Sequence, residues 1–305
     1  MNPLNRRDPS PRALPAAGIR FEANYERRVA ALMHRVAAAR QGREGAGGNS
    51  IRGLGEDLAG FRPYRPGEDL RQLDWNLLAR LDRPFVRVTR RQAGESWTIG
   101  LDASASMGAG PPGKLQRAAE CTGALVAIGL AQRAQVRVLV SAGAGSDPRV
   151  FTCRPRDERR GLLRFLEGVQ AAGSRGLADI LRTPRVLFPA SRLFLIGDLF
   201  DVEAAALLPL RRGNSEVSVL RLLAPEELEP ALGAREWWDP ESGEHLRVDV
   251  GEAQRGEYER RLERGLERWR QIAAAHRVGL VCRSTAVEFE DLVREWLKAA
   301  RMGTS

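Results

Sequence analysis

Two kinds of segment alternate along the chain from residue 97 onward, and this alternation limits the fold more than any other feature. Short apolar runs of strand length are separated by stretches whose apolar residues have helical spacing. Strands are predicted at residues 97–102, 135–141, 150–153, 193–198, 217–222 and 278–282. Helices are predicted at residues 115–132, 158–169, 177–181, 202–211, 257–275 and 287–300. Strands that alternate with helices predict an α/β fold whose mostly parallel sheet has helices on both faces.

Two of these helices differ in the distribution of their apolar residues. The helix at 115–132 is apolar nearly all round, which predicts that it is buried. The helix at 257–275 has apolar residues on one face only, namely Tyr258, Leu262, Leu266, Trp269 and Ile272. We therefore expect the second helix to cover an edge of the sheet.

The residues ahead of the alternating region predict little regular structure. Residues 1–20 contain no apolar core and are expected to be disordered, and residues 41–49 form a glycine-rich break. Between them, residues 21–40 predict an amphipathic helix, with one face formed by Tyr25, Val29, Leu32, Met33 and Val36. Such a helix can lie on a membrane, but packing against the body of the protein is the favoured prediction. Residues 51–89 are rich in turns and charges, with a strand expected at 85–90.

Composition limits the compartment and the partners. The 305 residues are 43% hydrophobic, which is enough for a substantial core. The net charge is +9, but acidic residues interrupt the basic clusters and no nucleic-acid motif accompanies them, so we expect no nucleic-acid partner. Only Lys114 and Lys298 are lysines among the 48 basic residues. Three widely spaced cysteines indicate core residues in a reducing compartment. With no secretory signal and no apolar stretch long enough to span a bilayer, a soluble cytoplasmic protein is expected.

Oxygen-bearing side chains follow two of the predicted strands. Asp102, Ser104 and Ser106 come directly after the strand at 97–102, and Asp198 ends the strand at 193–198, with Asp201 close behind. Residues at the carboxyl ends of parallel strands form the ligand crevice of an α/β sheet. Carboxylate and hydroxyl oxygens are the ligands of a hard cation such as Mg²⁺ or Mn²⁺. The sequence therefore predicts a metal site at this edge.

Two other interpretations of Asp102 stay open. Asp102 can cap the helix that follows, because Asp and Ser are common at helix starts. It also stands where phosphatases of the haloacid dehalogenase type hold their nucleophile, but those enzymes need a second carboxylate two residues later, where this chain has Ser104. No histidine falls at a predicted strand end near Asp102, and no nucleophile motif or phosphate-binding loop is present. We therefore expect a protein that is not an enzyme.

The same residues resemble known families. Asp102-x-Ser104-x-Ser106 after a first strand, with Asp198 after a later one, resembles the metal-ion-dependent adhesion site of von Willebrand factor A domains. The segment at 64–75, Tyr-Arg-Pro-Gly-Glu-Asp-Leu-Arg-Gln-Leu-Asp-Trp, is similar to the signature of domain-of-unknown-function family 58, whose members have a von Willebrand factor A-like fold. Residues 238–244 resemble a late loop of that family. The resemblance extends from about residue 52 to residue 297.

The resemblance implies a three-part organisation and a partner. Residues 1–50 would form the tail, helix and linker, residues 51–94 the signature segment, and residues 95–300 the von Willebrand factor A-like (Rossmann-like) domain. The implied role is that of a bacterial cytoplasmic adaptor or assembly factor working with a MoxR-type AAA+ ATPase, without known catalysis. Partner contacts are assigned to the signature segment, at Tyr64, Arg65, Asp69, Asp74 and Trp75.

One departure from the family pattern concerns the metal. A Gly-Thr-Asp-type loop usually supplies a further hydroxyl, and the corresponding stretch here is Gly173-Ser174-Arg175-Gly176. Ser174 can replace the threonine, whereas Arg175 would bring a positive charge toward the metal. A metal-dependent protein-binding module is therefore the leading hypothesis, with a metal-free scaffold and a Mg²⁺-dependent phosphate-ester hydrolase as alternatives.

Overall fold

The computed structural model describes residues 18–44, 57–64, 75–81, 83–90, 95–111, 113–141, 147–153, 159–174, 176–183, 187, 190–200, 202–203, 205–207, 215–239, 241 and 244–302. The chain forms two compact units. The large unit comprises residues 1–36 and 96–305, and the small unit comprises residues 37–95.

The small unit is built on an antiparallel pair of strands. Strand β1 (Asp57–Pro63) pairs with β2 (Phe85–Arg90), and the register shifts between Leu58 and Gly60, as at a β-bulge. Helix α2 (Trp75–Leu81) lies between the two strands in sequence. The strand predicted at 85–90 is confirmed, whereas the sequence reading did not foresee β1 or α2.

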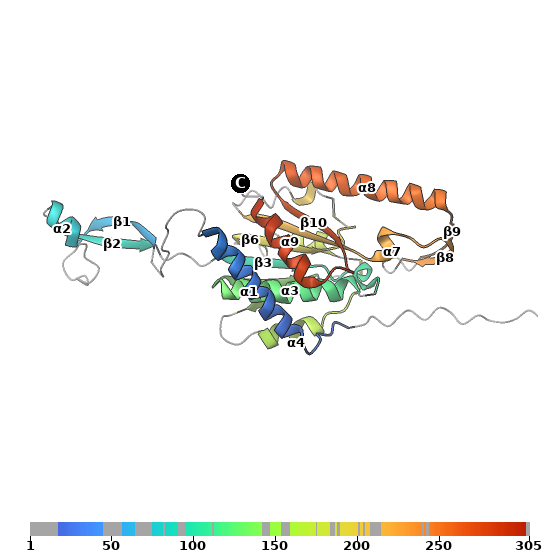
Figure 1. Ribbon diagram of the computed structural model, residues 1–305, viewed down its shortest axis with the longest axis horizontal. Helices are drawn as coiled ribbons and strands as arrows, with labels where there is room; N and C mark the ends of the chain where they lie inside the picture. The colour runs from blue at the N-terminus through green and yellow to red at the C-terminus, as the bar shows by residue number, and fades with distance from the viewer. Residues whose placement is uncertain are drawn as a thin grey trace, which may run out of the picture. The chain divides into compact units, whose positions relative to one another are not determined.

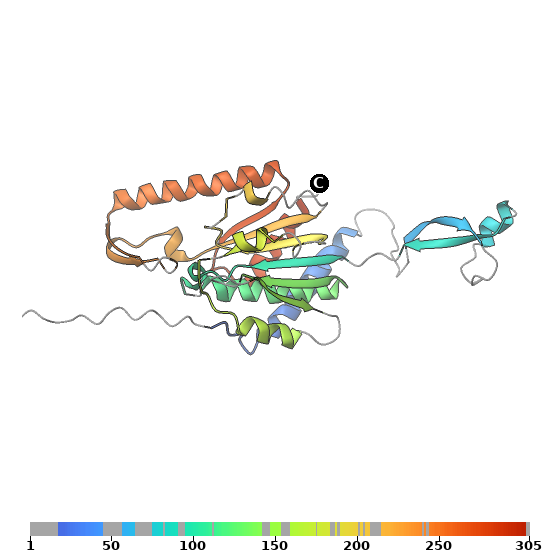
Figure 2. The same ribbon diagram turned by 180° about the vertical axis from the view of Figure 1, so that it is seen from behind.

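The large unit contains a six-stranded sheet with the order β10-β7-β6-β3-β4-β5 (Figures 1 and 2). Its strands are β3 (Ser96–Leu101), β4 (Gln135–Val140), β5 (Arg149–Cys153), β6 (Arg192–Gly197), β7 (Glu216–Leu223) and β10 (Gly279–Ser284). All neighbours are parallel except β5, which runs antiparallel to β4. The predicted mostly parallel sheet is confirmed, and all six predicted strands occur within two residues of their expected limits.

Helices cover both faces of this sheet, as predicted. One apolar core joins the sheet to α1 (Tyr25–Glu44), α3 (Lys114–Ala131), α4 (Arg159–Glu167) and α9 (Phe289–Met302). The other core joins it to α5 (Leu177–Leu181) and α8 (Glu252–Ala275). Side chains alternate along each strand, so Trp97, Ile99 and Leu101 of β3 all enter the first core. Figure 1 shows α1, α3 and α9 on one side of the sheet.

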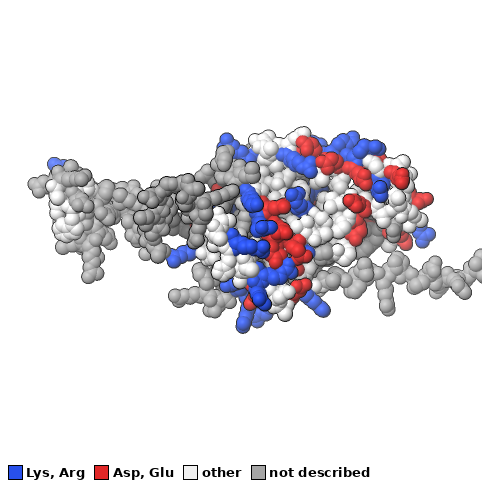
Figure 3. Space-filling view, in the orientation of Figure 1, with Lys and Arg blue, Asp and Glu red and all other residues white. Residues whose placement is uncertain are grey.

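The two helices singled out in the sequence behave as expected. Helix α3 is buried on nearly all sides, including Ala118, Leu125 and Val126 at 0% exposure. Helix α8 packs beside β10, the edge strand, and its buried Trp269 and Ala273 join the second core. Figure 3 shows acidic and basic side chains intermixed along the exposed part of α8, which agrees with the scattered charge of the sequence.

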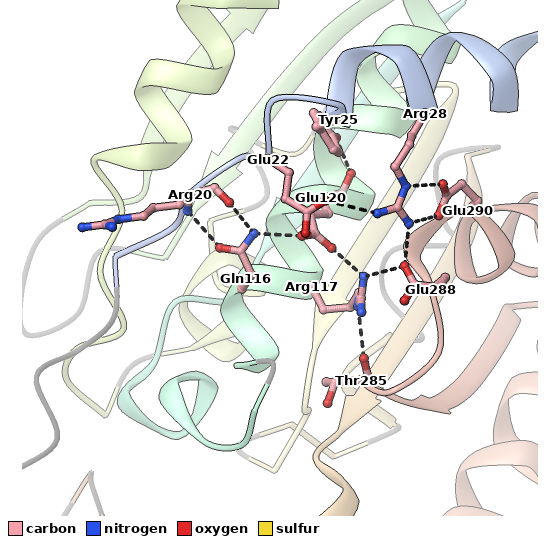
Figure 4. Close-up of polar contacts among 10 residues, drawn as sticks. All are labelled: Arg20, Glu22, Tyr25, Arg28, Gln116, Arg117, Glu120, Thr285, Glu288 and Glu290. Atoms are coloured by element: carbon pink, nitrogen blue, oxygen red, sulfur yellow. Dashed lines mark hydrogen bonds and ion pairs between the residues drawn. The ribbon is translucent and has the colours of Figure 1, made fainter.

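The N-terminal helix packs against the large unit. The predicted apolar face is confirmed, because Tyr25, Val29 and Leu32 are buried and Met33 and Val36 pack against the same core. Its polar contacts add to this packing (Figure 4). The Tyr25 hydroxyl donates to the Glu120 carbonyl of α3 at 2.6 Å, and Gly123 leaves the space that this hydroxyl occupies.

Arg28 of α1 forms a two-pronged ion pair with α9. Its Nε and Nη2 atoms donate to the two carboxylate oxygens of Glu290 at 2.7 and 2.8 Å, and Nη2 also contacts Glu288. The guanidinium lies 4.7 Å from the ring centre of Phe289. Figure 4 shows how Arg117 of α3 extends this network toward Glu288. Bidentate pairs of this kind fix orientation as well as contributing energy, so the contacts set the angle of α1 on the domain.

Some elements differ from the predictions. Strands β8 (Gly233–Trp238) and β9 (His245–Val250) form an antiparallel hairpin where no strands were expected. Residues 239–244, within the predicted late loop, connect these strands. Helix α8 begins at Glu252, five residues earlier than predicted. Of the helix predicted at 202–211, Val202 and Glu203 are not helical and residues 205–207 form a 3₁₀ turn, while residues 204 and 208–211 lie outside the described residues. The three-part division of the chain stays a prediction.

Candidate binding site at the carboxyl edge of the sheet

The predicted site lies where the strand order changes direction. Strands β3 and β6 are neighbours at the centre of the sheet, and the chain leaves β3 toward β4 on one side and β6 toward β7 on the other. Such a switch point opens a crevice at the carboxyl ends of the strands. Asp102 directly follows β3 and Asp198 directly follows β6, so the fold brings both predicted residues to this crevice.

Asp102 is held by the backbone around it. Its side chain is fully buried, and its N–H donates to the Ile196 carbonyl at 2.9 Å. Its Oδ1 accepts the Ser104 N–H at 2.9 Å, which closes a local turn. Glycine at residue 197 allows this close approach, because a Cβ atom there would lie 2.6 Å from the Asp102 Cβ and would force one of the two to shift. The carboxylate is thus fixed in position before any ligand arrives.

The two hydroxyls of the motif face each other. Ser104 is buried and Ser106 is half-buried, and their Oγ atoms lie 3.0 Å apart. The short 3₁₀-helix η2 (Ala105–Gly108) turns the chain at this point and brings the two side chains together. Neither η2 nor α3 has a side-chain cap, so the interpretation of Asp102 as a helix cap is wrong.

Two neighbouring segments support this loop. The Ser141 hydroxyl, after β4, accepts the Ala103 N–H at 2.7 Å. The loop at 171–174 lies alongside, because the Gly173 carbonyl accepts the Ala105 N–H at 2.8 Å. The family resemblance implied that this second loop would approach the motif. The Ser174 side chain itself is exposed, however, and no described contact joins it to Asp102; Arg175 lies outside the described residues.

Asp198 is engaged by a lysine that the sequence analysis did not assign to the site. The Nζ atom of Lys114 lies 2.7 Å from Asp198 Oδ2 and 2.6 Å from Glu227 Oε1. Lys114 is fully buried and is the first residue of α3, while Glu227 belongs to α7 (Pro225–Leu228), which follows β7. A buried ammonium is tolerated only when it is paired and hydrogen-bonded, and here two carboxylates meet that requirement.

The remaining oxygens of these carboxylates are also occupied. Asp198 Oδ1 accepts the Phe200 N–H at 3.3 Å, and Glu227 Oε2 accepts the Ala224 N–H at 2.7 Å. One signal could have identified Lys114, since it is one of only two lysines in a chain with 48 basic residues. Its burial depends on Glu227, which is more than a hundred residues away, and no local pattern reports that contact.

A second cation lies close to this ion pair. Arg221 of β7 is 5% exposed, and its guanidinium lies 5.2 Å from the ring centre of Phe200 and 5.9 Å from that of Trp269. Burial lowers the pKa of Arg221, and the nearby Asp198 and Glu227 partly oppose that effect. Lys114 also lies 5.4 Å from the Phe200 ring, so this aromatic side chain, 55% exposed, covers both cations.

The donor set suits a hard cation better than a soft one. Among the described residues, no cluster of three or more His, Cys, Asp or Glu side chains could hold a metal ion. One carboxylate and two hydroxyls, at Asp102, Ser104 and Ser106, are oxygen ligands of the kind that Mg²⁺ accepts together with water. The histidines, His34, His245 and His276, are all exposed.

The three cysteines are free thiols, and two of the five predicted partner-binding residues lie in the described part of the small unit. Cys121 and Cys153 are buried free thiols and Cys282 is a half-buried one, and burial raises the pKa of Cys121 and Cys282. Of the predicted partner-binding residues, Tyr64 is half-buried and Trp75 is 64% exposed, both in the small unit. The other three, Arg65, Asp69 and Asp74, lie outside the described residues. No helix in the described part of the chain is long and apolar enough to cross a membrane.

These features define an α/β domain with oxygen-bearing side chains and a buried ion pair at the switch point of its sheet. The chain belongs to the family described as "Protein of unknown function DUF58", whose model matches residues 60–267. Uncharacterised proteins of Mycobacterium bovis and Mycobacterium tuberculosis are 28% identical over 240 residues, which cover 74% of this chain and 70% of each relative.

Two solved structures from Bacteroides are also similar to this chain. The conserved hypothetical protein BatB of Bacteroides thetaiotaomicron is 19% identical with a TM-score of 0.40, over 68% of this chain and 100% of that one. An aerotolerance-related membrane protein of Bacteroides fragilis is 18% identical with a TM-score of 0.41, over 68% of this chain and 99% of that one.

Proposed function

We propose that this chain is a non-catalytic protein-binding module that holds Mg²⁺ or Mn²⁺ at Asp102, Ser104 and Ser106 and offers it to a carboxylate of a partner protein. The observation that carries the proposal is the arrangement of the motif. A buried carboxylate and two hydroxyls 3.0 Å apart lie on one loop at the carboxyl edge of the sheet. Mg²⁺ completes its octahedral shell with water, and a partner's carboxylate can replace such a water.

The described charges around the site support a cation there. Asp198 and Glu227 pair with Lys114 and lie near Arg221, so these four charges cancel, and the Asp102 carboxylate adds one net negative charge at this edge of the sheet. A divalent cation would reverse that sign and would favour an acidic partner group. Because Lys114 already engages Asp198, the proposed ligands are the three side chains of the Asp102 loop.

The absence of catalysis belongs to the same proposal. A phosphatase of the type considered above needs an acid two residues after its nucleophile, and that position is the hydroxyl of Ser104. The amine of Lys114 is fully buried and is already paired with two carboxylates, so it is not free to act as the missing acid. We expect no turnover of phosphate esters that depends on Asp102.

The proposed partner comes from the family resemblance. The Asp102-x-Ser104-x-Ser106 pattern supports a von Willebrand factor A-like domain, and the signature at 64–75 supports an adaptor or assembly factor that works with a MoxR-type AAA+ ATPase. A cytoplasmic location fits the three free thiols. In this proposal, the metal loop makes one contact with the ATPase, and Tyr64 and Trp75 of the small unit make another.

The metal is tested first. Titration calorimetry and thermal melts in Mg²⁺ and Mn²⁺ should show binding and stabilisation in the wild type, because a ligand that binds only the folded state raises its stability. Asp102→Asn should abolish both signals. Asp249→Asn, which changes an exposed aspartate on β9, is the matched control and should respond like the wild type.

The partner is tested by affinity capture from the native host with and without EDTA. Recovery of an AAA+ ATPase that weakens with EDTA and with Asp102→Asn supports the proposal. Recovery of nucleic acid or lipid in place of an ATPase would overturn it. ATPase capture that ignores both changes would move the interface away from the metal loop.

A metal-free scaffold is the second candidate, and the Lys114 contacts favour it. An ammonium already lies between Asp198 and Glu227 at this edge and supplies a positive charge without any metal. If millimolar Mg²⁺ gives neither heat nor a melting shift, this candidate replaces the first. Arg175→Thr then shows whether the arginine of the neighbouring loop was blocking the cation.

A further inference from the structure

Arg221 has no hydrogen-bonding partner among the described residues, although its side chain is buried. It lies in β7 at 5% exposure, and its Nε atom is buried without a hydrogen bond among the described residues. No described carboxylate lies within ion-pair distance of its guanidinium. A guanidinium has five donor hydrogens, and buried arginines are almost always paired. The described structure therefore contains a largely buried cation whose Nε donor makes no hydrogen bond.

The nearest carboxylates cannot serve Arg221. Both oxygens of Asp198 and both oxygens of Glu227 already accept hydrogen bonds, from Lys114 and from the Phe200 and Ala224 backbone. Their charges act on Arg221 only from a distance. The guanidinium instead lies against two aromatic rings, those of Phe200 and Trp269. Stacking stabilises the charge but accepts no hydrogen bond.

The outer of the two rings is placed to admit a ligand. Phe200 is 55% exposed, whereas Trp269 is 7% exposed. Leu199, which precedes Phe200, has a φ angle of 59°, a left-handed conformation that a branched side chain rarely adopts. Strained residues of this kind cluster at ligand sites, where the surrounding structure holds them. The side with the exposed Phe200 ring is therefore the side from which a ligand can approach the guanidinium.

We propose that Arg221 is the centre of an oxyanion-binding site, in which Phe200 forms the outer wall and Trp269 the inner wall. The ligand is a carboxylate or phosphate group, because both present paired oxygens that match the planar guanidinium. Anion binding at Arg221 does not need a cation at Asp102, so this proposal can be correct whether or not the proposed metal site exists. The oxyanion that binds there is either a free anion or an acidic group of a partner protein.

The test compares anions at constant ionic strength. Thermal melts and titration calorimetry of the whole chain are run with inorganic phosphate, with acetate and with chloride. The wild type should be stabilised by phosphate, by acetate or by both beyond the effect of chloride. A response to acetate points to a protein carboxylate as the natural ligand, and a response to phosphate alone points to a phosphorylated one.

Three variants connect the response to the site. Arg221→Met should lose it, with the apparent affinity falling at least about tenfold, while melting at or above the wild-type temperature in chloride, because an unpaired buried charge has been removed. Arg221→Lys keeps the charge but not the planar fork and should respond weakly. Arg268→Gln, on the exposed part of α8, is the control and should leave the response unchanged.

Three results would overturn the proposal. The first is an equal response of the wild type to all three anions. The second is a specific response that survives in Arg221→Met, since the anion then binds elsewhere. The third concerns Asp201, which follows Phe200 in the sequence and lies outside the described residues. If anions act on Asp201→Asn but not on the wild type, the arginine has an internal partner.

Discussion

Replacement of Lys114 by methionine is the most direct test of the energetics of the crevice. Methionine keeps much of the length and the apolar stem of lysine but removes the charge. The ammonium is fully buried and holds Asp198, at 2.7 Å, and Glu227, at 2.6 Å. After the substitution, the Asp198 carboxylate, 2% exposed, is left buried without its cation. Removing one partner of a buried ion pair costs about 3–5 kcal/mol, mostly because the other charge stays desolvated.

The expected loss is large enough to measure without ambiguity. For a domain of this size, about 2–3 °C of melting temperature corresponds to 1 kcal/mol, so Lys114→Met should melt roughly 6–15 °C below the wild type. Urea unfolding followed by circular dichroism gives the free energy directly. Lys298→Met is the natural control, because Lys298 is the other lysine of the chain and is exposed. It should change the free energy of unfolding by no more than about 0.5 kcal/mol.

A double variant shows whether the cost arises from the stranded carboxylate. Lys114→Met combined with Asp198→Asn removes both charges, so it should be more stable than Lys114→Met alone, with a coupling energy of about 1–3 kcal/mol. If Lys114→Met lies within about 1 kcal/mol of the wild type, or if the double variant is less stable than either single variant, the ion-pair reasoning is refuted. The single variant should also bind Mg²⁺ more tightly if the proposed metal site is correct, because the crevice gains negative charge.

Three further changes test the surrounding contacts. Gly197→Ala places a Cβ 2.6 Å from that of Asp102 and should cost about 1–3 kcal/mol in urea unfolding while abolishing the Mg²⁺ response. Burial opposes ionisation of Glu290, but hydrogen bonds from Arg28 and from the backbone, together with the charges of Arg28 and Arg35, outweigh burial and lower the pKa of Glu290. Stability from this pair is therefore complete above the ordinary pKa of a glutamate and is lost as the pH falls through the lowered pKa. Unfolding measured from about pH 6 to pH 3 should show a steeper acid loss in the wild type than in Glu290→Gln. Tyr25→Phe removes a 2.6 Å hydrogen bond to a carbonyl of α3 and should cost about 1 kcal/mol in the same assay.

The sheet was predictable because its strands are apolar and its helices have regular spacing. In β3 and β6 nearly every residue is buried, so both strands appear in the sequence as continuous apolar runs. The β8–β9 hairpin lacks that signal, because most of its described side chains are exposed. Leu246, Val248 and Val250 do alternate with polar residues, but Leu246 is 63% exposed and only Val250 is buried. The alternating pattern is therefore present, but it predicts a strand only weakly, because few side chains of the hairpin are buried.

The site was predictable to the extent that it lies in one loop. Asp102, Ser104 and Ser106 are neighbours in sequence, so their proximity follows from local geometry and from the position of the strand end. Lys114 and Arg221 were not found, because their roles depend on contacts between distant segments. Apart from the rarity of lysine in this chain, nothing in the local sequence indicates that either basic residue is buried.

The position of Lys114 explains why two opposite kinds of ligand can be proposed at one edge of the sheet. It is the first residue of α3, where the helix dipole disfavours a positive charge, so its burial there depends on Asp198 and Glu227. By engaging both carboxylates, Lys114 removes Asp198 from the ligand set of the Asp102 loop. It also removes both acids as partners for Arg221. The same ion pair therefore leaves an oxygen-rich loop that suits a cation and, beside it, a guanidinium that suits an anion.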